Sequence, residues 1–248
     1  MKKYLFFIAS LFVLLSSCKT YYTVENTKSS FNKIDKKLDG KGNSDIDNII
    51  APYKDKLSKK MNEVLGYSDG LSKKQPESTL GNWIADAIVD GAERISSMKV
   101  DFAIQNYGGV RIKDLAEGEI TLGKIYELMP FNNYVVILKA DGDVTKQLLD
   151  LMASRGGWPI SKSVHYKIEG DKAVDIFING EPFDENKTYI IALPDYIANG
   201  GDKCYFLKDA EKIDTDQVLI RDILAEEVQI AAKNGKHINA KIEGRVIK

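Results

Sequence analysis

The sequence predicts an α/β (α+β) fold, in which a mixed sheet is flanked by helices. Two observations predict this class. Segments with the apolar spacing of a helix intermix with β-rich segments throughout the chain. The composition, with 44% hydrophobic and 29% charged residues in a chain of 248, is that of a globular domain, and no internal repeat is evident.

The first 17 residues predict a lipoprotein signal peptide. A basic start precedes an apolar run over residues 4–15 that is too short to span a bilayer comfortably. The sequence Leu15-Ser16-Ser17-Cys18 resembles a bacterial lipobox, whose cleavage leaves the cysteine as a lipidated first residue. We therefore expect an exported cell-envelope lipoprotein, anchored to a membrane by lipid on Cys18. An ordinary secretory signal and a buried helix are the alternatives.

Net charge and cysteine content limit the possible binding partners and the role of Cys204. A formal net charge of −1 provides no basic field, so we expect no nucleic-acid polymer as a partner. With Cys18 committed to lipid, Cys204 has no cysteine to pair with, and we expect it to be a small buried side chain rather than a nucleophile.

Residues 18–44 are polar, with no sustained apolar period, and predict a tether; residues 45–248 form the predicted domain. Apolar spacing and capping signals predict its helices. These are 45–65, ended by Gly66; 80–95; 121–128, with Thr121 as N-cap; a helix capped by Asp143 that ends at Gly156; and a helix from a capping box of Asp214 and Gln217 to Asn234.

β-rich segments predict the strands of the sheet. They are 100–105, 134–140, 163–168, 174–178, 188–193 and 240–247. The pair Asn179-Gly180 indicates a turn.

The strand at 100–105 leads into the loop Asn106-Tyr107-Gly108-Gly109-Val110-Arg111. Two glycines allow positive φ and close backbone approach, so their N–H groups could converge on an anion. Arg111 offers a planar fork suited to phosphate or carboxylate. A plain turn after a strand is the alternative, because Gly-Gly is common in hairpins.

Hydrolytic chemistry lacks its usual residues in this sequence. The chain has two histidines, His165 and His237, neither in a metal-binding pattern, and no serine in a Gly-x-Ser-x-Gly turn. We expect no catalytic residue, no metal site and no cofactor in this chain, and we expect His165 to be packed or on the surface.

Three loops carry groups that a nucleotide can use. Phe131 and Tyr196 could stack on a base, at about 1–3 kcal/mol per base. Asp202 could accept hydrogen bonds from ribose hydroxyls, and Arg111 could bind a charged oxygen. Taken singly, each feature is more often structural.

Together, four ordered segments resemble the successive motifs of the 5′-nucleotidase C-terminal domain family, a likeness that runs from about residue 45 to residue 248. The segments are Glu77-Ser78-Thr79-Leu80-Gly81-Asn82, Asn106-Tyr107-Gly108-Gly109-Val110-Arg111, Met129-Pro130-Phe131-Asn132 and Tyr196-Ile197-Ala198-Asn199-Gly200-Gly201-Asp202.

The resemblance implies a mixed α/β unit that binds the nucleoside part of a substrate. Phe131 and Tyr196 would then be the stacking pair, and Asp202 would face the ribose hydroxyls. Asn106 and Gly109 would face the base or ribose. Arg111 would bind the phosphate end, and Asn82 would be mainly structural.

Two positions depart from the family pattern. Thr79 stands where some relatives carry a second phosphate-binding arginine, and Tyr107 replaces a small glycine, so a weaker grip on phosphate is expected. The N-terminal metallophosphatase domain of the family, with its two metal ions and its catalytic Asp-His pair, has no counterpart in this sequence.

We therefore expect the chain to be the substrate-recognition half of a 5′-nucleotidase-type hydrolase. It would act in nucleotide catabolism with a separate metallophosphatase that holds the di-metal site. A non-catalytic envelope lipoprotein that binds nucleotides or nucleosides is the alternative.

Overall fold

The computed structural model describes residues 26–31, 44–213 and 217–248. The predicted signal peptide, Cys18, most of the predicted tether and Asp214 lie outside these residues. The chain divides into two units, Met1–Ile50 and Ala51–Lys248. In the first unit, residues 26–31 are exposed and form no helix or strand. Among the described residues, no helix is both long and apolar enough to cross a membrane.

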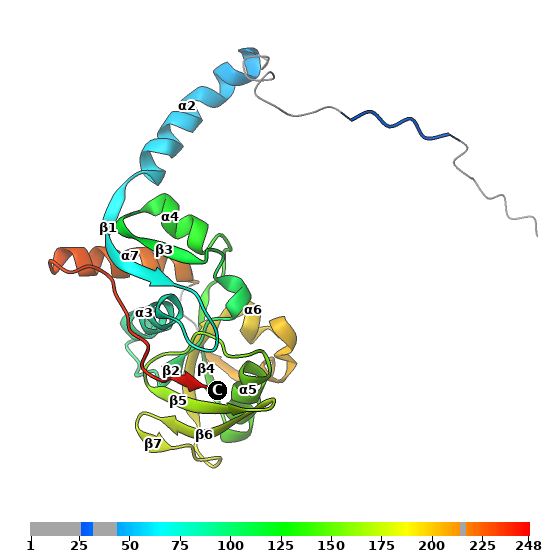
Figure 1. Cartoon of the computed structure of the whole chain (residues 1–248), viewed down its shortest axis with the longest axis vertical. Helices are drawn as coiled ribbons and strands as arrows, with labels where there is room; N and C mark the ends of the chain where they lie inside the picture. The colour runs from blue at the N-terminus through cyan, green and yellow to red at the C-terminus, as the bar shows by residue number, and fades with distance from the viewer. Residues whose placement is uncertain (1–25, 32–43, 214–216) are drawn as a thin grey trace, which may run out of the picture. The chain divides into compact units, whose positions relative to one another are not determined.

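Helix α2 (Ser44–Met61) begins in the first unit and ends in the second. The prediction that it continues to about residue 65 is wrong, because strand β1 (Val64–Ser72) follows. This strand pairs antiparallel with β3 (Asp114–Thr121), and neither strand was predicted (Figure 1). The apolar residues of β1 fit a helical spacing as well as a strand, so the sequence does not separate the two.

The central sheet is mixed, as predicted. Its order is β2 (Phe102–Ala103), β8 (Tyr189–Pro194), β4 (Val135–Ala140) and β9 (Glu211–Ile213). Strand β2 runs parallel to β8, whereas β4 is antiparallel to both β8 and β9. Only part of the predicted strand at 100–105 pairs as a ladder, and β9 was not predicted.

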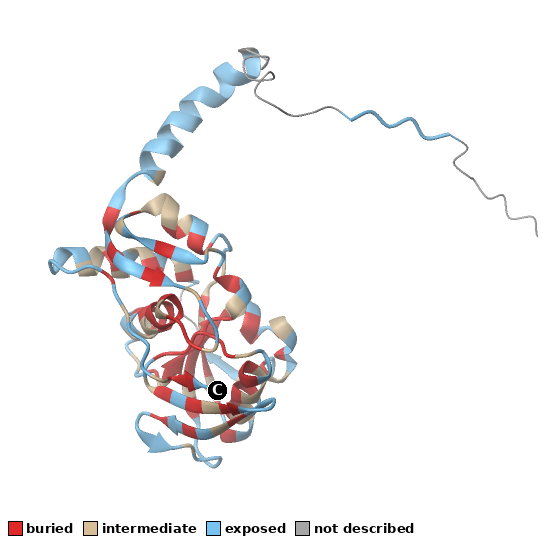
Figure 2. Ribbon diagram, in the orientation of Figure 1, coloured by how far each residue is buried: buried red, intermediate tan, exposed pale blue. Residues whose placement is uncertain are grey.

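Both faces of the central sheet are buried, and successive residues of β4 enter two different cores. Ile137 packs in one cluster beneath α3 (Thr79–Ser96) and α7 (Ile220–Lys233). Leu138 packs in the other beneath α5 (Gly142–Ser154) and the second sheet. Side chains alternate across a strand, so one short strand contributes to both layers of the domain. Figure 2 shows the central strands as buried.

The second sheet has the order β10 (Val246–Ile247), β5 (Val164–Glu169), β6 (Lys172–Ile178) and β7 (Glu181–Pro182). The turn between β6 and β7 is confirmed: Asn179 and Gly180 have φ of 57° and 80°. Of the predicted strand at 240–247, only the last residues pair, parallel to β5.

Capping explains where the helices begin. Thr121 caps α4 (Leu122–Leu128) as predicted, accepting a hydrogen bond from Lys124 N at 3.2 Å. Helix α5 is capped by Asp141 rather than by Asp143, since Asp141 Oδ1 accepts from Val144 N at 2.8 Å. The capping-box prediction for α7 is wrong: Gln217 has a φ of 55°, and the helix begins at Ile220.

The carboxylate of Glu77 joins the first motif to the end of the chain. It accepts hydrogen bonds from the backbone N–H groups of Glu243, Gly244 and Arg245, at 2.8–3.1 Å. Arg245 is 2% exposed and forms two hydrogen bonds with Asp86, both of 2.8 Å. A buried charge needs such partners, so these contacts fix the start of α3 against the last strand.

Candidate functional site

Three loops meet in a cleft of about 350 Å³ at one end of the central sheet. The first follows β2 and contains the 3₁₀ turn η2 (Tyr107–Gly109), and the second follows α4. The third follows β8 and contains α6 (Asp195–Ala198) and the turn η3 (Gly201–Lys203). The residues that line the cleft are Asn106, Gly108, Gly109, Arg111, Phe131, Asn133, Tyr196 and Asp202.

All six residues predicted to bind substrate line this one cleft. Phe131 and Tyr196 are 49% and 47% exposed, so each offers about half of its surface to a ligand. Sequence reasoning missed Gly108 and Asn133, although both lie beside predicted residues in the same loops. The structure therefore brings the six together, and their binding roles stay predictions.

A chain of hydrogen bonds fixes the polar wall of the cleft. Gln105 Nε2 donates to Asn106 Oδ1 at 2.8 Å, which turns the amide nitrogen of Asn106 toward Asp202. Asn106 Nδ2 then donates to Asp202 Oδ2 at 2.7 Å, and the Tyr196 hydroxyl donates to Asp202 Oδ1 at 3.2 Å. Residues about ninety positions apart thus hold one carboxylate in place.

Gly109 allows a close approach rather than forming an anion nest. Neither Gly108 nor Gly109 has a positive φ, and Gly109 N donates to Asn106 O at 3.0 Å, within the turn. A Cβ at Gly109 would clash with Gln105 Nε2, so a side chain there would displace the amide that orients Asn106. The prediction of N–H groups converging on an anion is therefore wrong for Gly109.

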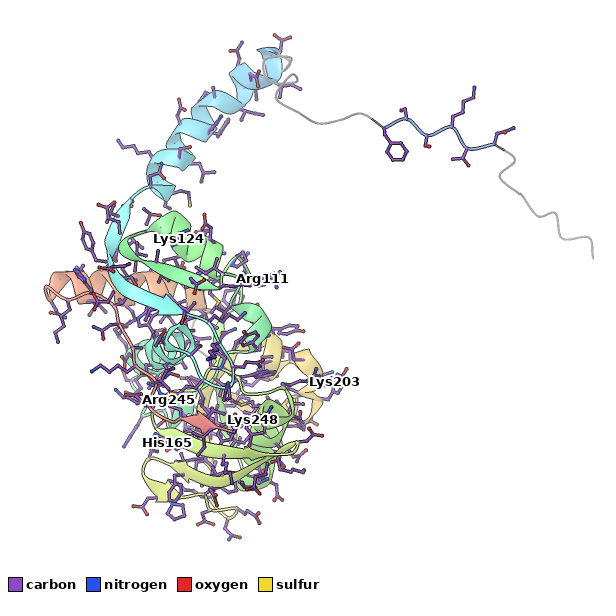
Figure 3. The ribbon with its side chains drawn as sticks, in the orientation of Figure 1. Arg111, Lys124, His165, Lys203, Arg245 and Lys248 are labelled. Atoms are coloured by element: carbon purple, nitrogen blue, oxygen red, sulfur yellow. The ribbon has the colours of Figure 1, made fainter. Side chains whose placement is uncertain are left out.

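Arg111 is exposed, and no carboxylate pairs with it among the described residues. One guanidinium nitrogen donates to Gly108 O at 3.3 Å, and the group lies 5.6 Å from the centre of the Phe131 ring. In the view of Figure 3, Arg111 and Lys203, next to Asp202, lie on the same side of the molecule. Arg111 keeps donors free for an anionic group.

Lys73, which was not predicted as a site residue, is a second cation beside the first loop. Its ammonium donates to Val110 O at 2.6 Å and lies 3.8 Å from the centre of the Tyr107 ring. Burial and the nearby charge of Arg111 lower the pKa of Lys73 below its ordinary value. Tyr107, which stands where the family pattern has a glycine, supplies the ring. This departure was the feature of the sequence that could have pointed to Lys73.

Four other residues of interest in the sequence do not line the cleft: Thr79, Asn82, His165 and Cys204. Asn82 is buried, and its amide donates to Glu77 Oε1 and Lys241 O, a structural role. His165 is exposed on β5. Cys204 is fully buried, and burial raises the pKa of its thiol to about 12, which disfavours the nucleophilic thiolate. Thr79 accepts a hydrogen bond from Ser72 N rather than lining the cleft.

A larger hollow, of about 660 Å³, lies between α3, α7 and β1 and contains none of the predicted site residues. Its Asp69 is already occupied, by His237 at 2.8 Å and Asn239 at 3.1 Å. Within the described part of the chain, no group of three or more His, Cys, Asp or Glu side chains could hold a metal ion.

The mixed sheets and the cleft define an α/β domain that carries its candidate ligand site on loops at the end of a sheet. The family model described as the 5′-nucleotidase C-terminal domain matches residues 60–209, more than half of the sequence. The chain therefore belongs to the 5′-nucleotidase C-terminal domain family.

Two curated relatives illustrate the similarity. The chain is 26% identical over 218 residues to the trifunctional nucleotide phosphoesterase protein YfkN of Bacillus subtilis, covering 79% of this chain and 14% of that protein. It is 26% identical over 189 residues to the NAD 5′-nucleotidase of Haemophilus influenzae, covering 63% of this chain and 30% of that protein. The chain spans less than a third of either relative.

Solved structures share the fold. The 5′-nucleotidase precursor from Thermus thermophilus superposes with a TM-score of 0.67 at 24% identity, over 81% of this chain and 42% of that one. The NAD nucleotidase of Haemophilus influenzae gives a TM-score of 0.62 at 22% identity, over 82% and 41%. These likenesses confirm the predicted fold class.

Proposed function

We propose that this chain is the substrate-recognition half of a 5′-nucleotidase-type nucleotide hydrolase. The observation that carries the proposal is the single cleft in which two half-exposed rings, an oriented carboxylate and an arginine meet, and this arginine pairs with no carboxylate among the described residues. Its volume of about 350 Å³ falls in the range of small-molecule sites, about 300–1,000 Å³. In this proposal the base lies between the two rings, the ribose binds to Asp202 and the phosphate binds to Arg111.

Hydrolysis would require a metallophosphatase acting with this domain. Attack on phosphorus needs an activated water, which two-metal sites supply in many phosphatases. Because no metal-ligating cluster forms among the described residues, the proposal assigns that step to a separate metallophosphatase. The named relatives, of which this chain covers less than a third, are described as a nucleotide phosphoesterase and an NAD 5′-nucleotidase, in keeping with such a partnership.

The test is calorimetric titration of the purified protein with AMP and with adenosine, without added metal. We expect binding that is lost in the double variant Phe131→Ala/Tyr196→Ala. Tyr205→Ala is the matched control, because Tyr205 is 65% exposed and does not line the cleft. A double variant that binds as well as the wild type would contradict the proposed stacking.

A hydrolysis assay separates the proposed hydrolase from the alternative, a non-catalytic envelope lipoprotein that captures nucleotides. The candidate metallophosphatase is mixed with the protein, and AMP hydrolysis is measured. A rate increase that is lost in Phe131→Ala/Tyr196→Ala supports the hydrolase. Tight AMP binding without any rate increase favours the capture protein instead.

We also propose attachment to a membrane of the cell envelope through lipid on Cys18, on the strength of the lipobox-like sequence. Cys18→Ala in the producing bacterium should move the protein from the membrane fraction to the aqueous fraction. Cys204→Ala, which removes the buried cysteine, is the control and should leave the distribution unchanged. Retention of Cys18→Ala in the membrane would contradict the anchor.

A further inference from the structure

The hydroxyl of Tyr196 holds Asp202 at two points. It donates to Asp202 Oδ1 at 3.2 Å, and its oxygen accepts from the backbone N–H of Asp202 at 3.3 Å. The ring itself lies against Gly201, where a Cβ would be 2.5 Å from Tyr196 Cε1. The aromatic plate and the carboxylate therefore form one unit, connected through the phenol oxygen.

Backbone geometry explains why Asp202 needs this support. Asp202 and Lys203 have φ of 50° and 73°, and Gly200 before them has a φ of 92°. The left-handed region is unfavourable for an ordinary L-residue, although Asp tolerates it better than most. Such a conformation persists only where its surroundings fix it. Tyr196 from the same loop and Asn106 from the first loop provide the contacts that do so.

The acceptor capacity of Asp202 indicates what it can bind. An ionised carboxylate has about four acceptor positions, two on each oxygen. Asn106 Nδ2 uses one position on Oδ2, and the Tyr196 hydroxyl uses one on Oδ1. One acceptor position remains on each oxygen of a side chain that lines the cleft. Two donors side by side, as in the vicinal cis-diol of a ribose, fill both.

We propose that Tyr196 is a positioning residue whose hydroxyl, by holding Asp202, makes the cleft select sugars with both ribose hydroxyls over deoxy sugars. This inference rests on the proposed binding of a nucleoside or nucleotide in the cleft. It assigns Tyr196 two separable contributions: the ring stacks on a base, and the hydroxyl sets sugar selectivity through Asp202. Phenylalanine at this position retains the first contribution and removes the second.

The experiment measures dissociation constants of the whole protein for AMP and for 2′,3′-dideoxy-AMP, with wild type and Tyr196→Phe. Each charge-assisted hydrogen bond to the diol contributes about tenfold or more, so the wild type should prefer AMP by at least about 10-fold. Tyr196→Phe should weaken AMP binding by about 10-fold and dideoxy-AMP binding by less than about 2-fold. The preference for the ribose should therefore nearly disappear.

Two further variants make the result specific. Asp202→Asn should lower the preference for the ribose in the same way, which covers the case in which Tyr196→Phe does not fold. Tyr205→Phe removes an exposed phenol outside the cleft and should retain the full preference.

Equal losses for both ligands in Tyr196→Phe would overturn the inference, because a purely structural role affects both alike. A wild type that binds both nucleotides equally would overturn the inference and leave the proposed function standing. A wild type that binds neither would overturn the proposed function and the inference together.

Discussion

Lys73 puts a half-buried ammonium next to Arg111, and this pairing predicts a proton uptake on ligand binding. Burial and Arg111 both disfavour the charged form, so the pKa of Lys73 lies below the ordinary lysine value of about 10.4. A phosphate bound at Arg111 supplies the opposite charge and raises that pKa again. At about pH 9.5, AMP binding should therefore take up protons, whereas adenosine binding should not.

Calorimetry in two buffers of different ionisation enthalpy measures this uptake. Lys73→Met should abolish it, and Lys74→Met, at an exposed neighbouring lysine, should retain it. An uptake that persists in Lys73→Met would assign the titrating proton to another group.

We expect the thiol of Cys204 to be unreactive in the folded protein. Its thiol is fully buried, and burial raises its pKa to about 12, so only about one molecule in ten thousand carries the thiolate at pH 8. In a Cys18→Ala variant, where Cys204 is the only thiol, a maleimide should react at a rate set by unfolding. The reaction should accelerate steeply across the urea transition. Rapid labelling without urea would contradict the buried environment.

At the scale of single residues, the sequence located the site better than it described its geometry. Phe131, Tyr196 and Asp202 were found because they lie in motifs that occur in a recognisable order, although each residue taken singly is more often structural. Lys73 was missed because its contact with Tyr107 joins segments that are distant in sequence. The hydrogen bond from Tyr196 to Asp202 depends on a left-handed backbone, which no residue pattern specifies.

Helices α3 and α7 are in contact where Gly91 packs against Ile223. A Cβ at this position would be 2.3 Å from Ile223 Cγ2, well inside van der Waals contact. Gly91→Ala gains about 1 kcal/mol of helix propensity but overpacks the interface at a cost of about 1–3 kcal/mol, so we expect a net loss of up to about 2 kcal/mol.

Urea unfolding of Gly91→Ala, Ile223→Ala and the double variant tests this contact. The double variant should be more stable than the sum of the two single losses predicts, because Ile223→Ala removes the atoms that clash. If the two losses of stability simply add, residue 91 and Ile223 do not interact, and the proposed clash is contradicted.

Among the elements, those with one clear period were predicted and those with two readings were not. Strands β4, β5, β6 and β8 and helices α3 to α5 were found within a few residues. The first residues of β1 were assigned to the end of α2 and no strand was predicted after Gly66, and β3, with its charged and glycine residues, carries little β-propensity. The start of α7 was misplaced because a capping-box pattern occurs there without a helix.

The whole domain depends on the carboxylate of Glu77, which binds the chain near its last strand. Glu77→Gln replaces one carboxylate oxygen by an NH2 group. At the Oε2 position this donor would face the backbone N–H groups of Gly244 and Arg245, so we expect a loss of at least about 2 kcal/mol. Urea unfolding measures the change. Glu169→Gln is the control, because Glu169 is exposed and pairs only with Lys167, and it should change stability by less than about 0.5 kcal/mol.

These backbone contacts of Glu77 can form only late in synthesis. Glu77 leaves the ribosome early, yet three of its backbone partners and the strand that completes the second sheet come last. At about 5–20 residues per second, the roughly 170 residues in between take roughly 10–30 s to translate. Strand β5 is translated about 80 residues before β10, so for about 4–15 s its edge toward β10 is unpaired and open to chaperones and to aggregation.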